Sequence, residues 1–193
     1  LELICSKLSQ VANVKIIRIH TRVPVQLPDM VNLALFGAIC EQFSTVYCAV
    51  HVDHPDELVP DAERLLVAMR RTGLILLAQS VFLRGVNDDV QTLRRLFTRM
   101  SELGIRPYYI YHCQAIPTTM HFVMNVEDEV SIMSELRRVL SGVAYPQHVI
   151  DIQHARGKVI VPTDHWRVNM SHVKDYDGRW LSVLDHVMTP LED

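Results

Sequence analysis

Short apolar runs recur along the chain between segments whose apolar residues repeat at helical spacing. The runs predict strands, and the segments between them predict helices. The first four runs begin at intervals of about thirty residues, which is the length of one βα unit. The expected strands span 15–20, 46–51, 74–80, 106–113 and 147–151.

The helices are marked by their apolar periodicity and by residues typical of helix ends. Proline and acidic residues suit a first turn, asparagine or aspartate suits the position before it, and glycine suits the position after the last turn. On this basis Pro28, Pro55 and Asn87-Asp88 each begin a helix, and Gly73, Gly104 and Gly142 each follow one. The expected helices span about 1–11, 28–43, 55–73, 87–104 and 127–141.

This alternation predicts an α/β fold that forms part of a parallel (β/α) TIM-type barrel, whose chemistry lies at the carboxyl ends of the strands. After Lys158 the pattern changes to short strands and turns, at 159–161, 166–169, 175–178 and 180–184. We therefore expect residues 1–158 to form a partial barrel and residues 159–193 to form a β-rich C-terminal extension.

Composition narrows the range of partners and compartments. Of 193 residues, 49% are hydrophobic and 21% charged, and a net charge of −3 gives no reason to expect nucleic acid or a membrane as a partner. No apolar run approaches the roughly 18 residues of a membrane span. The four cysteines lack the spacing of a disulfide framework or zinc site, so we expect a cytoplasmic protein. The start at Leu1, inside a helical pattern, suggests a truncated or processed N-terminus.

Polar residues follow all five expected strands. His51, Asp53 and His54 could form a metal cluster, or Pro55 could make this segment a capping turn. Arg22 could clamp a carboxylate or phosphate, or form a surface salt bridge.

Two further residues admit both a functional and a structural role. Gln79 ends an apolar strand, where a ligand contact and a structural hydrogen bond are both open. Lys158 follows Gly157 on a short loop, where it could form a Schiff base with pyridoxal phosphate or remain a solvated lysine.

Several stretches together resemble the lysine 2,3-aminomutase family, which are radical S-adenosylmethionine enzymes that also use pyridoxal phosphate. The resemblance covers residues 1–158 and continues weakly to 176–178. It implies the second half of a radical S-adenosylmethionine barrel. The stretches that carry it are 17–25, 51–57, 79–88, 106–111 and His121-Phe122.

The resemblance implies a role for individual residues. Lys158 matches the lysine that holds pyridoxal phosphate, and Gln79 matches the glutamine that contacts its phosphate. His51 and His121 match residues near the S-adenosylmethionine pocket. In lysine-specific members, two aspartates hold the distal ammonium of the substrate. One of them matches Asp151, and the position of the other is occupied by Gln114.

The departures from the family pattern concern substrate, phosphate and metal. Gln114 is a neutral amide where the family has a carboxylate, which weakens the case for lysine as substrate. The glycine-rich run before the cofactor lysine is replaced by residues 153–157, where His154 and Arg156 could contact the phosphate instead. Asp89 stands at the position of a zinc cysteine, so we expect no protein-bound metal.

The CxxxCxxC loop that binds the family's 4Fe–4S cluster does not occur in the sequence. The chain is therefore expected to be either the C-terminal part of an aminomutase-like enzyme or a remnant that has lost radical chemistry. In the intact enzyme an amino group would move from C2 to C3 of an amino acid held as an imine on pyridoxal phosphate. The isolated chain would be inactive.

Two other functions remain open at this stage. A half barrel leaves two sheet edges unpaired, so a non-catalytic module that binds a cofactor or partner, and that self-associates, is the first alternative. A hydrolase that uses His51, Asp53 and His54 is the second.

Overall fold

The computed structural model describes residues 1–152, 157–163, 172–174 and 179–182. Its main element is a curved sheet of six strands that lie side by side in chain order. The first five strands are parallel, and β6 runs antiparallel to β5. The strands are β1 (Ile16–Thr21), β2 (Thr45–His51), β3 (Ile75–Val81), β4 (Arg106–Tyr111), β5 (Gln147–Ile152) and β6 (Gly157–Ile160).

A separate antiparallel pair follows the main sheet. It consists of β7 (His172–Lys174) and β8 (Trp180–Ser182). The five strands predicted from the sequence are thus confirmed, with ends that differ by one or two residues. Of the strands expected in the extension, those at 166–169 and 175–178 lie outside the described residues.

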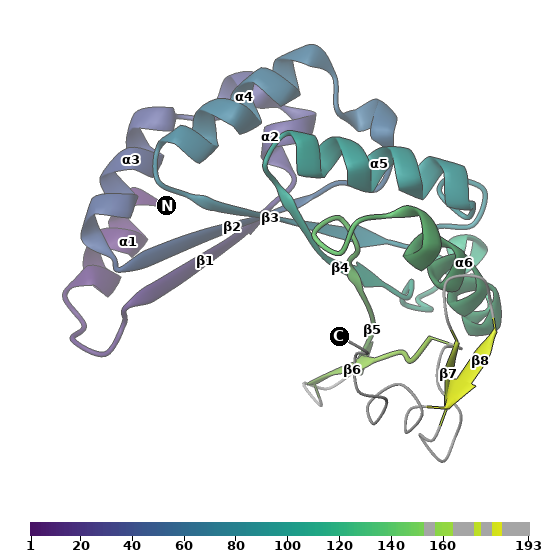
Figure 1. Cartoon of the computed structure of the whole chain (residues 1–193). Helices are drawn as coiled ribbons and strands as arrows, with labels where there is room; N and C mark the ends of the chain where they lie inside the picture. The colour runs from purple at the N-terminus through teal and green to yellow at the C-terminus, as the bar shows by residue number, and fades with distance from the viewer. Residues whose placement is uncertain (153–156, 164–171, 175–178, 183–193) are drawn as a thin grey trace, which may run out of the picture.

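The longer helices lie along one face of the sheet, as Figure 1 shows for α3, α4 and α5. In the described part of the chain no helix covers the opposite face, which is the concave one in this view. The helices are α1 (Glu2–Ser9), α2 (Val23–Gln26), α3 (Leu33–Gln42), α4 (Pro60–Arg71), α5 (Val90–Glu102) and α6 (Val126–Val139).

The core forms between the helices and the covered face of the sheet. Alternate residues of β3 are buried, as in a strand with one packed face. They meet helix side chains that are fully buried, including Leu66 of α4, Leu93 and Leu96 of α5, and Leu136 of α6. The other set of alternate positions faces the open side and stays partly exposed.

Two helices begin later than the proline positions predict. Pro28 and Pro55 each begin a single 3-10 turn, Pro28–Met30 and Pro55–Glu57. Helix α3 starts only after Asn32, whose Oδ1 accepts the N–H of Leu35 at 3.2 Å. Proline fixes the backbone angle for a first turn but does not ensure that the turn continues.

The cap of α5 also differs from the prediction. Asp89, not Asn87 or Asp88, accepts the backbone N–H of Thr92 at 2.9 Å. Asp89, which matched a zinc-cysteine position, therefore has a structural role as a helix cap. Asn87 is fully buried, and its side chain bonds to the backbone of the loops that follow β2 and β3.

The four cysteines are free, and Cys5, Cys48 and Cys113 are buried. Burial raises the pKa of the Cys48 thiol to about 12, so it stays protonated at neutral pH. No helix in the described ranges is long and apolar enough to cross a membrane.

Gly73 ends α4 with φ = +99°, a left-handed backbone conformation that other L-residues adopt at a cost. We predict that Gly73→Ala lowers the free energy of unfolding by about 1–2 kcal/mol. Gly142→Ala is the matched control, because an added Cβ meets no atom within 4 Å there. Urea unfolding of both variants tests this, and equal stability of the two would contradict it.

Candidate active site at the carboxyl ends of the strands

The carboxyl ends of the parallel strands meet at one edge of the sheet, because these strands all run in the same direction. The register there pairs His51 of β2 with Gln79 of β3. At the far side of the sheet, antiparallel pairing places Lys158 of β6 opposite Asp151 of β5. Residues separated by more than a hundred positions in the chain are thereby held at the same edge.

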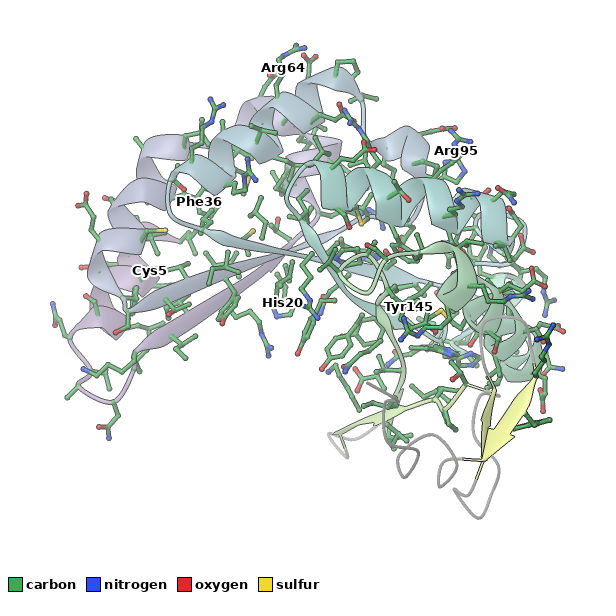
Figure 2. The ribbon with its side chains drawn as sticks, in the orientation of Figure 1. Cys5, His20, Phe36, Arg64, Arg95 and Tyr145 are labelled. Atoms are coloured by element: carbon green, nitrogen blue, oxygen red, sulfur yellow. The ribbon has the colours of Figure 1, made fainter. Side chains whose placement is uncertain are left out.

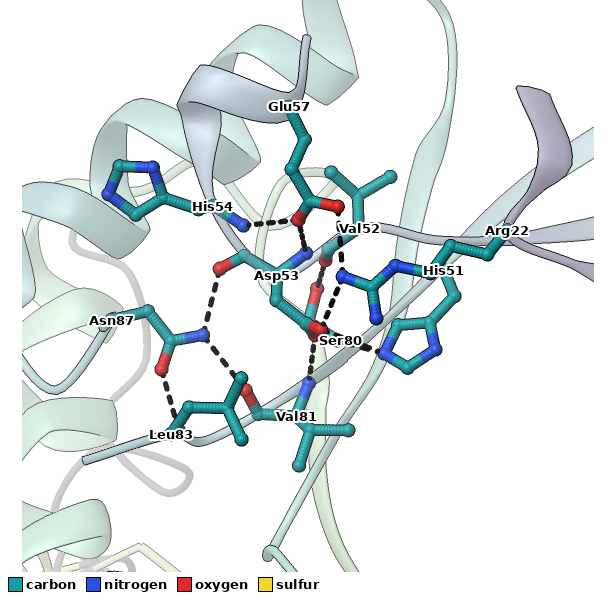
Figure 3. Close-up of polar contacts among 10 residues, drawn as sticks. All are labelled: Arg22, His51, Val52, Asp53, His54, Glu57, Ser80, Val81, Leu83 and Asn87. Atoms are coloured by element: carbon teal, nitrogen blue, oxygen red, sulfur yellow. Dashed lines mark hydrogen bonds and ion pairs between the residues drawn. The ribbon is translucent and has the colours of Figure 1, made fainter. Parts of the chain in front are cut away.

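The carboxylate of Asp53 organises one half of this edge (Figure 3). Its side chain is 4% exposed. One oxygen accepts the N–H of Val81 at 2.8 Å, and the other lies 3.0 Å from Nη2 of Arg22. Nε2 of His51 lies 3.1 and 3.0 Å from the two oxygens. A buried carboxylate needs such partners to offset the loss of hydration, so Asp53 fixes the positions of Arg22 and His51.

Glu57 bonds to Arg22 as well, and also to the backbone beside Asp53. It accepts a hydrogen bond from Nη2 of Arg22 at 2.9 Å and the backbone N–H groups of Asp53 and His54 at 2.6 and 2.9 Å. Burial disfavours the charge of Arg22. The hydrogen bond to Glu57 and the negative charges of Asp53 and Glu57 outweigh burial and raise the pKa of Arg22. Arg22 is therefore ion-paired with Asp53 and Glu57 of the same chain.

His54 does not join His51 and Asp53 around a common point. Its Nδ1 accepts the N–H of Asp56 at 3.2 Å, and Glu57 completes a capping box. Figure 3 shows its ring turned away from Asp53. Of the two interpretations of this segment, the capping turn is the one that the structure contains.

Asn87 ties the loop after β2 to the loop after β3. Its amide nitrogen donates to the carbonyl oxygens of Asp53 and Val81, both at 2.8 Å. Its oxygen accepts the N–H of Leu83, also at 2.8 Å. All three contacts appear in Figure 3, and together they connect the two loops.

Tyr111 is the centre of the other half of the edge. Nε2 of Gln79 donates to its hydroxyl at 3.1 Å, while Oε1 of Gln79 lies 3.0 Å from Nδ1 of His20. Nζ of Lys158 lies 5.8 Å from the centre of the Tyr111 ring and 3.6 Å from a carboxylate oxygen of Asp151. His20 points to the open side of the sheet in Figure 2. Gln79 and Lys158 thus approach one tyrosine from different strands.

The hydroxyl of Tyr111 is neutral at physiological pH. Burial, followed by the negative charges of Tyr109 and Asp151, raises its pKa to about 12. It can therefore donate a hydrogen bond while it accepts one from Gln79.

A cavity of about 400 Å³ opens between the two halves of the edge. This volume lies within the usual range for a small-molecule site of roughly 300–1,000 Å³. Its apolar wall includes Leu83, Ile116 and Phe122. Its polar lining includes Arg22, His51, Tyr111, His112, Gln114 and Asp151.

A second hollow of about 370 Å³ lies around Arg18, Tyr47 and Arg106. None of the residues expected to form the site lines it. The cavity at the carboxyl ends of the strands is therefore the better candidate for chemistry.

Behind the cavity lies a polar group that the sequence analysis missed. Glu129 of α6 is fully buried between two histidines. Its carboxylate lies 2.9 Å from Nδ1 of His112 and 2.9 Å from Nε2 of His148. The three residues lie 17 and 19 positions apart, so no local motif marks them.

The expected site residues fall into three groups. His51, Gln114 and Asp151 line the cavity. Gln79 and Lys158 lie beside it through their contacts with Tyr111. His121 is exposed in the turn Met120–Phe122, where its ring packs on Phe122, a cavity residue, at 4.0 Å between centroids. Residues 153–156, which include His154 and Arg156, lie outside the described residues.

The chain is similar in sequence to several known proteins. No protein-family model matches the chain. It is 33% identical to the L-lysine 2,3-aminomutase of Clostridium subterminale over 174 residues, which are 90% of this chain and 41% of that protein. It is 35% identical to the L-lysine 2,3-aminomutase of Fusobacterium nucleatum over 83% of this chain and 38% of that protein.

A relative with a different named substrate also matches. The glutamate 2,3-aminomutase of Clostridioides difficile is 30% identical over 82% of this chain and 37% of that protein. The chain therefore spans about two fifths of the length of the curated relatives it matches.

We predict that Asp53→Ala lowers the free energy of unfolding by about 3–5 kcal/mol, because it leaves the N–H of Val81 without its partner and Arg22 with Glu57 alone. Asp53→Asn keeps one acceptor and should cost about 1–3 kcal/mol. Asp56→Asn, with an exposed side chain, is the control and should cost little. The prediction fails if denaturant unfolding gives the same stability for Asp53→Ala and Asp56→Asn.

Tyr111 also predicts a dependence of stability on pH. Tyrosine ionises near pH 10 in an unfolded chain, whereas the pKa of Tyr111 is about 12 in the folded chain. Between these values only the unfolded chain loses the proton, so stability is full below about pH 10 and falls as the pH rises towards 12. Unfolding at a series of pH values should show a smaller fall for Tyr111→Phe than for the wild type. An identical slope would argue against the shift.

Proposed function

This chain belongs to the lysine 2,3-aminomutase family, and we propose that it forms the C-terminal part of an amino-acid 2,3-aminomutase-like enzyme. The reaction would move an amino group from C2 to C3 of an α-amino acid, which makes the enzyme an isomerase. The observation that carries the proposal is the approach of Gln79 and Lys158 to Tyr111, beside a cavity lined by His51 and Asp151. The partner we propose is a small-molecule amino acid, in a cytoplasmic setting.

The residues at this edge fit pyridoxal phosphate. Lys158 offers a primary amine, Tyr111 offers an aromatic face and Gln79 offers an amide donor for a phosphate oxygen. Lys158 would hold the cofactor and Gln79 would contact its phosphate. When bound, the cofactor delocalises electrons from the reacting amino acid through its ring.

The chain's own groups would position the substrate. Asp151 and Gln114 line the same cavity and would face the substrate side chain. Asp151 also lies 3.6 Å from Nζ of Lys158. The apolar wall of Leu83, Ile116 and Phe122 would limit the access of water.

His51 and His121 are the residues we assign to S-adenosylmethionine. His51 is held by Asp53 at the cavity edge. Because Nε2 of His51 is bonded to Asp53, Nδ1 is the nitrogen left for a ligand. His121 lies in the turn beside Phe122.

The described residues do not fit a 4Fe–4S cluster. Among them, no group of three or more His, Cys, Asp or Glu side chains could hold a metal ion. Cys5, Cys48 and Cys113 are buried separately in α1, β2 and the segment after β4. We therefore propose that the cluster ligands come from a part of the enzyme outside this chain, and we assign no step to these cysteines.

The open edge of the sheet suggests where that part would join. β1 is an edge strand that pairs only with β2 within the described sheet, and the side chain of Ile16 on it is 59% exposed. We propose that further βα units of a TIM-type barrel, or a second copy of the chain in a homo-oligomer, pair with this edge. The coding sequence upstream of Leu1 tests the first option, since it should encode a CxxxCxxC loop.

Cofactor attachment provides the direct test. The chain has four lysines, Lys7, Lys15, Lys158 and Lys174. After incubation with pyridoxal phosphate and reduction with borohydride, peptide mapping should find most of the label on Lys158. Gln79→Ala should weaken binding about tenfold, because it removes a hydrogen bond to a charged group.

Lys15→Arg is the matched control for Lys158→Arg. The first should keep the labelling of the wild type, and the second should lose it. Equal labelling of all four lysines would remove Lys158 from the site and with it the main support for the proposed function.

A further inference from the structure

The buried trio of His112, Glu129 and His148 joins the cavity to the inside of the protein. Glu129 is 0% exposed, and the side chains of His112 and His148 are 19% and 2% exposed. A carboxylate accepts hydrogen bonds, so Nδ1 of His112 and Nε2 of His148 must both carry hydrogens. These contacts fix the tautomer of both rings unless a ring is doubly protonated.

Charge balance distinguishes the two histidines. If both rings were neutral, Glu129 would be an uncompensated buried charge, which is strongly unfavourable. One imidazolium makes the trio neutral. Of the two rings, His112 reaches the cavity, whereas the ring of His148 is enclosed and packs edge-on against Phe82 at 5.2 Å.

His112 therefore presents the Nε2 side of its ring to the cavity. Its Nδ1 is engaged by Glu129, so Nε2 is the nitrogen left to meet a ligand. The backbone N–H of His112 donates to the carbonyl oxygen of Val149 at 2.9 Å, which fixes the base of the side chain. The ring is thus held from both ends.

The carboxylates around the cavity are already matched by cations of the chain. Asp53 pairs with Arg22, and Asp151 pairs with Lys158. A distal ammonium on the substrate would have to rely on Asp151 once Lys158 carries a cofactor, because the other expected contact, Gln114, is a neutral amide. A distal carboxylate would meet a donor on His112 and the amide of Gln114.

We propose that His112 carries the positive charge that balances Glu129, contacts the substrate through Nε2 and selects an α-amino dicarboxylic acid. This rests on the proposed function, because it takes the cavity as the amino-acid site. Glu129 and His148 are positioning residues, since they act through His112.

Three amino acids that share one head group test the selection. Calorimetric titration of the full-length protein, loaded with pyridoxal phosphate, with L-glutamate, L-glutamine and L-lysine isolates the distal group. Glutamate should bind about tenfold more tightly than glutamine, its nearly isosteric neutral analogue, and more tightly than lysine. Tighter binding of lysine than of glutamate would overturn the proposal.

Variants assign the preference to the trio. His112→Gln and Glu129→Gln should each reduce the ratio of glutamate to glutamine affinity to about one, a readout that a purely structural role would not move. His54→Gln, which alters a histidine outside the cavity, should leave the ratio unchanged. An unchanged affinity ratio in His112→Gln would show that His112 does not contact the distal group of the substrate.

A variant that is expected to gain affinity for one ligand distinguishes a change of selectivity from a loss of binding caused by misfolding. Gln114→Asp adds a carboxylate to the same cavity, so it should strengthen lysine binding and weaken glutamate binding. Borohydride labelling of Lys158 in each sample separates the two proposals. Labelled protein without a preference for glutamate overturns the assignment of His112 alone, whereas protein without label on Lys158 overturns the proposed function as well.

Discussion

In the described part of the chain, helices cover only one face of the sheet, and the position of the site follows from this arrangement. Side chains of a strand alternate between two faces, so each strand gives one set of residues to the core and the other set to the open side. Leu76, Ala78 and Ser80 of β3 are buried, whereas Leu77, Gln79 and Val81 alternate with them on the open side. A polar residue such as Gln79 can therefore sit in an apolar strand without entering the core.

The second requirement is compensation of buried carboxylates. Asp53 and Glu129 are nearly or fully inaccessible to water, and each is bonded to a cation or imidazole from another strand or loop. Such groups stabilise the fold only when all their partners are present. They thereby make the positions of Arg22, His51 and His112 around the cavity precise, which a site for a small ligand needs.

The family and the geometry contribute different information. The chain belongs to the lysine 2,3-aminomutase family, but the matching relatives are named for both lysine and glutamate. The family alone therefore leaves the distal group of the substrate open. The contacts of His112 and the place of Gln114 in the cavity lining provide the basis for choosing between a cationic and an anionic substrate.

Apolar periodicity was enough to predict the five parallel strands and the approximate positions of the helices. Periodicity is a local property, and a chain with these apolar runs has few other ways to bury them. Tertiary structure decided that α3 begins at Leu33 and α4 at Pro60, because packing and caps settle where a first turn continues. It also decided that His54 caps a turn, that Tyr111 joins Gln79 to Lys158, and that Glu129 bridges two histidines. Hydrogen bonds between distant strands follow no period in the sequence, so only the folded chain specifies them.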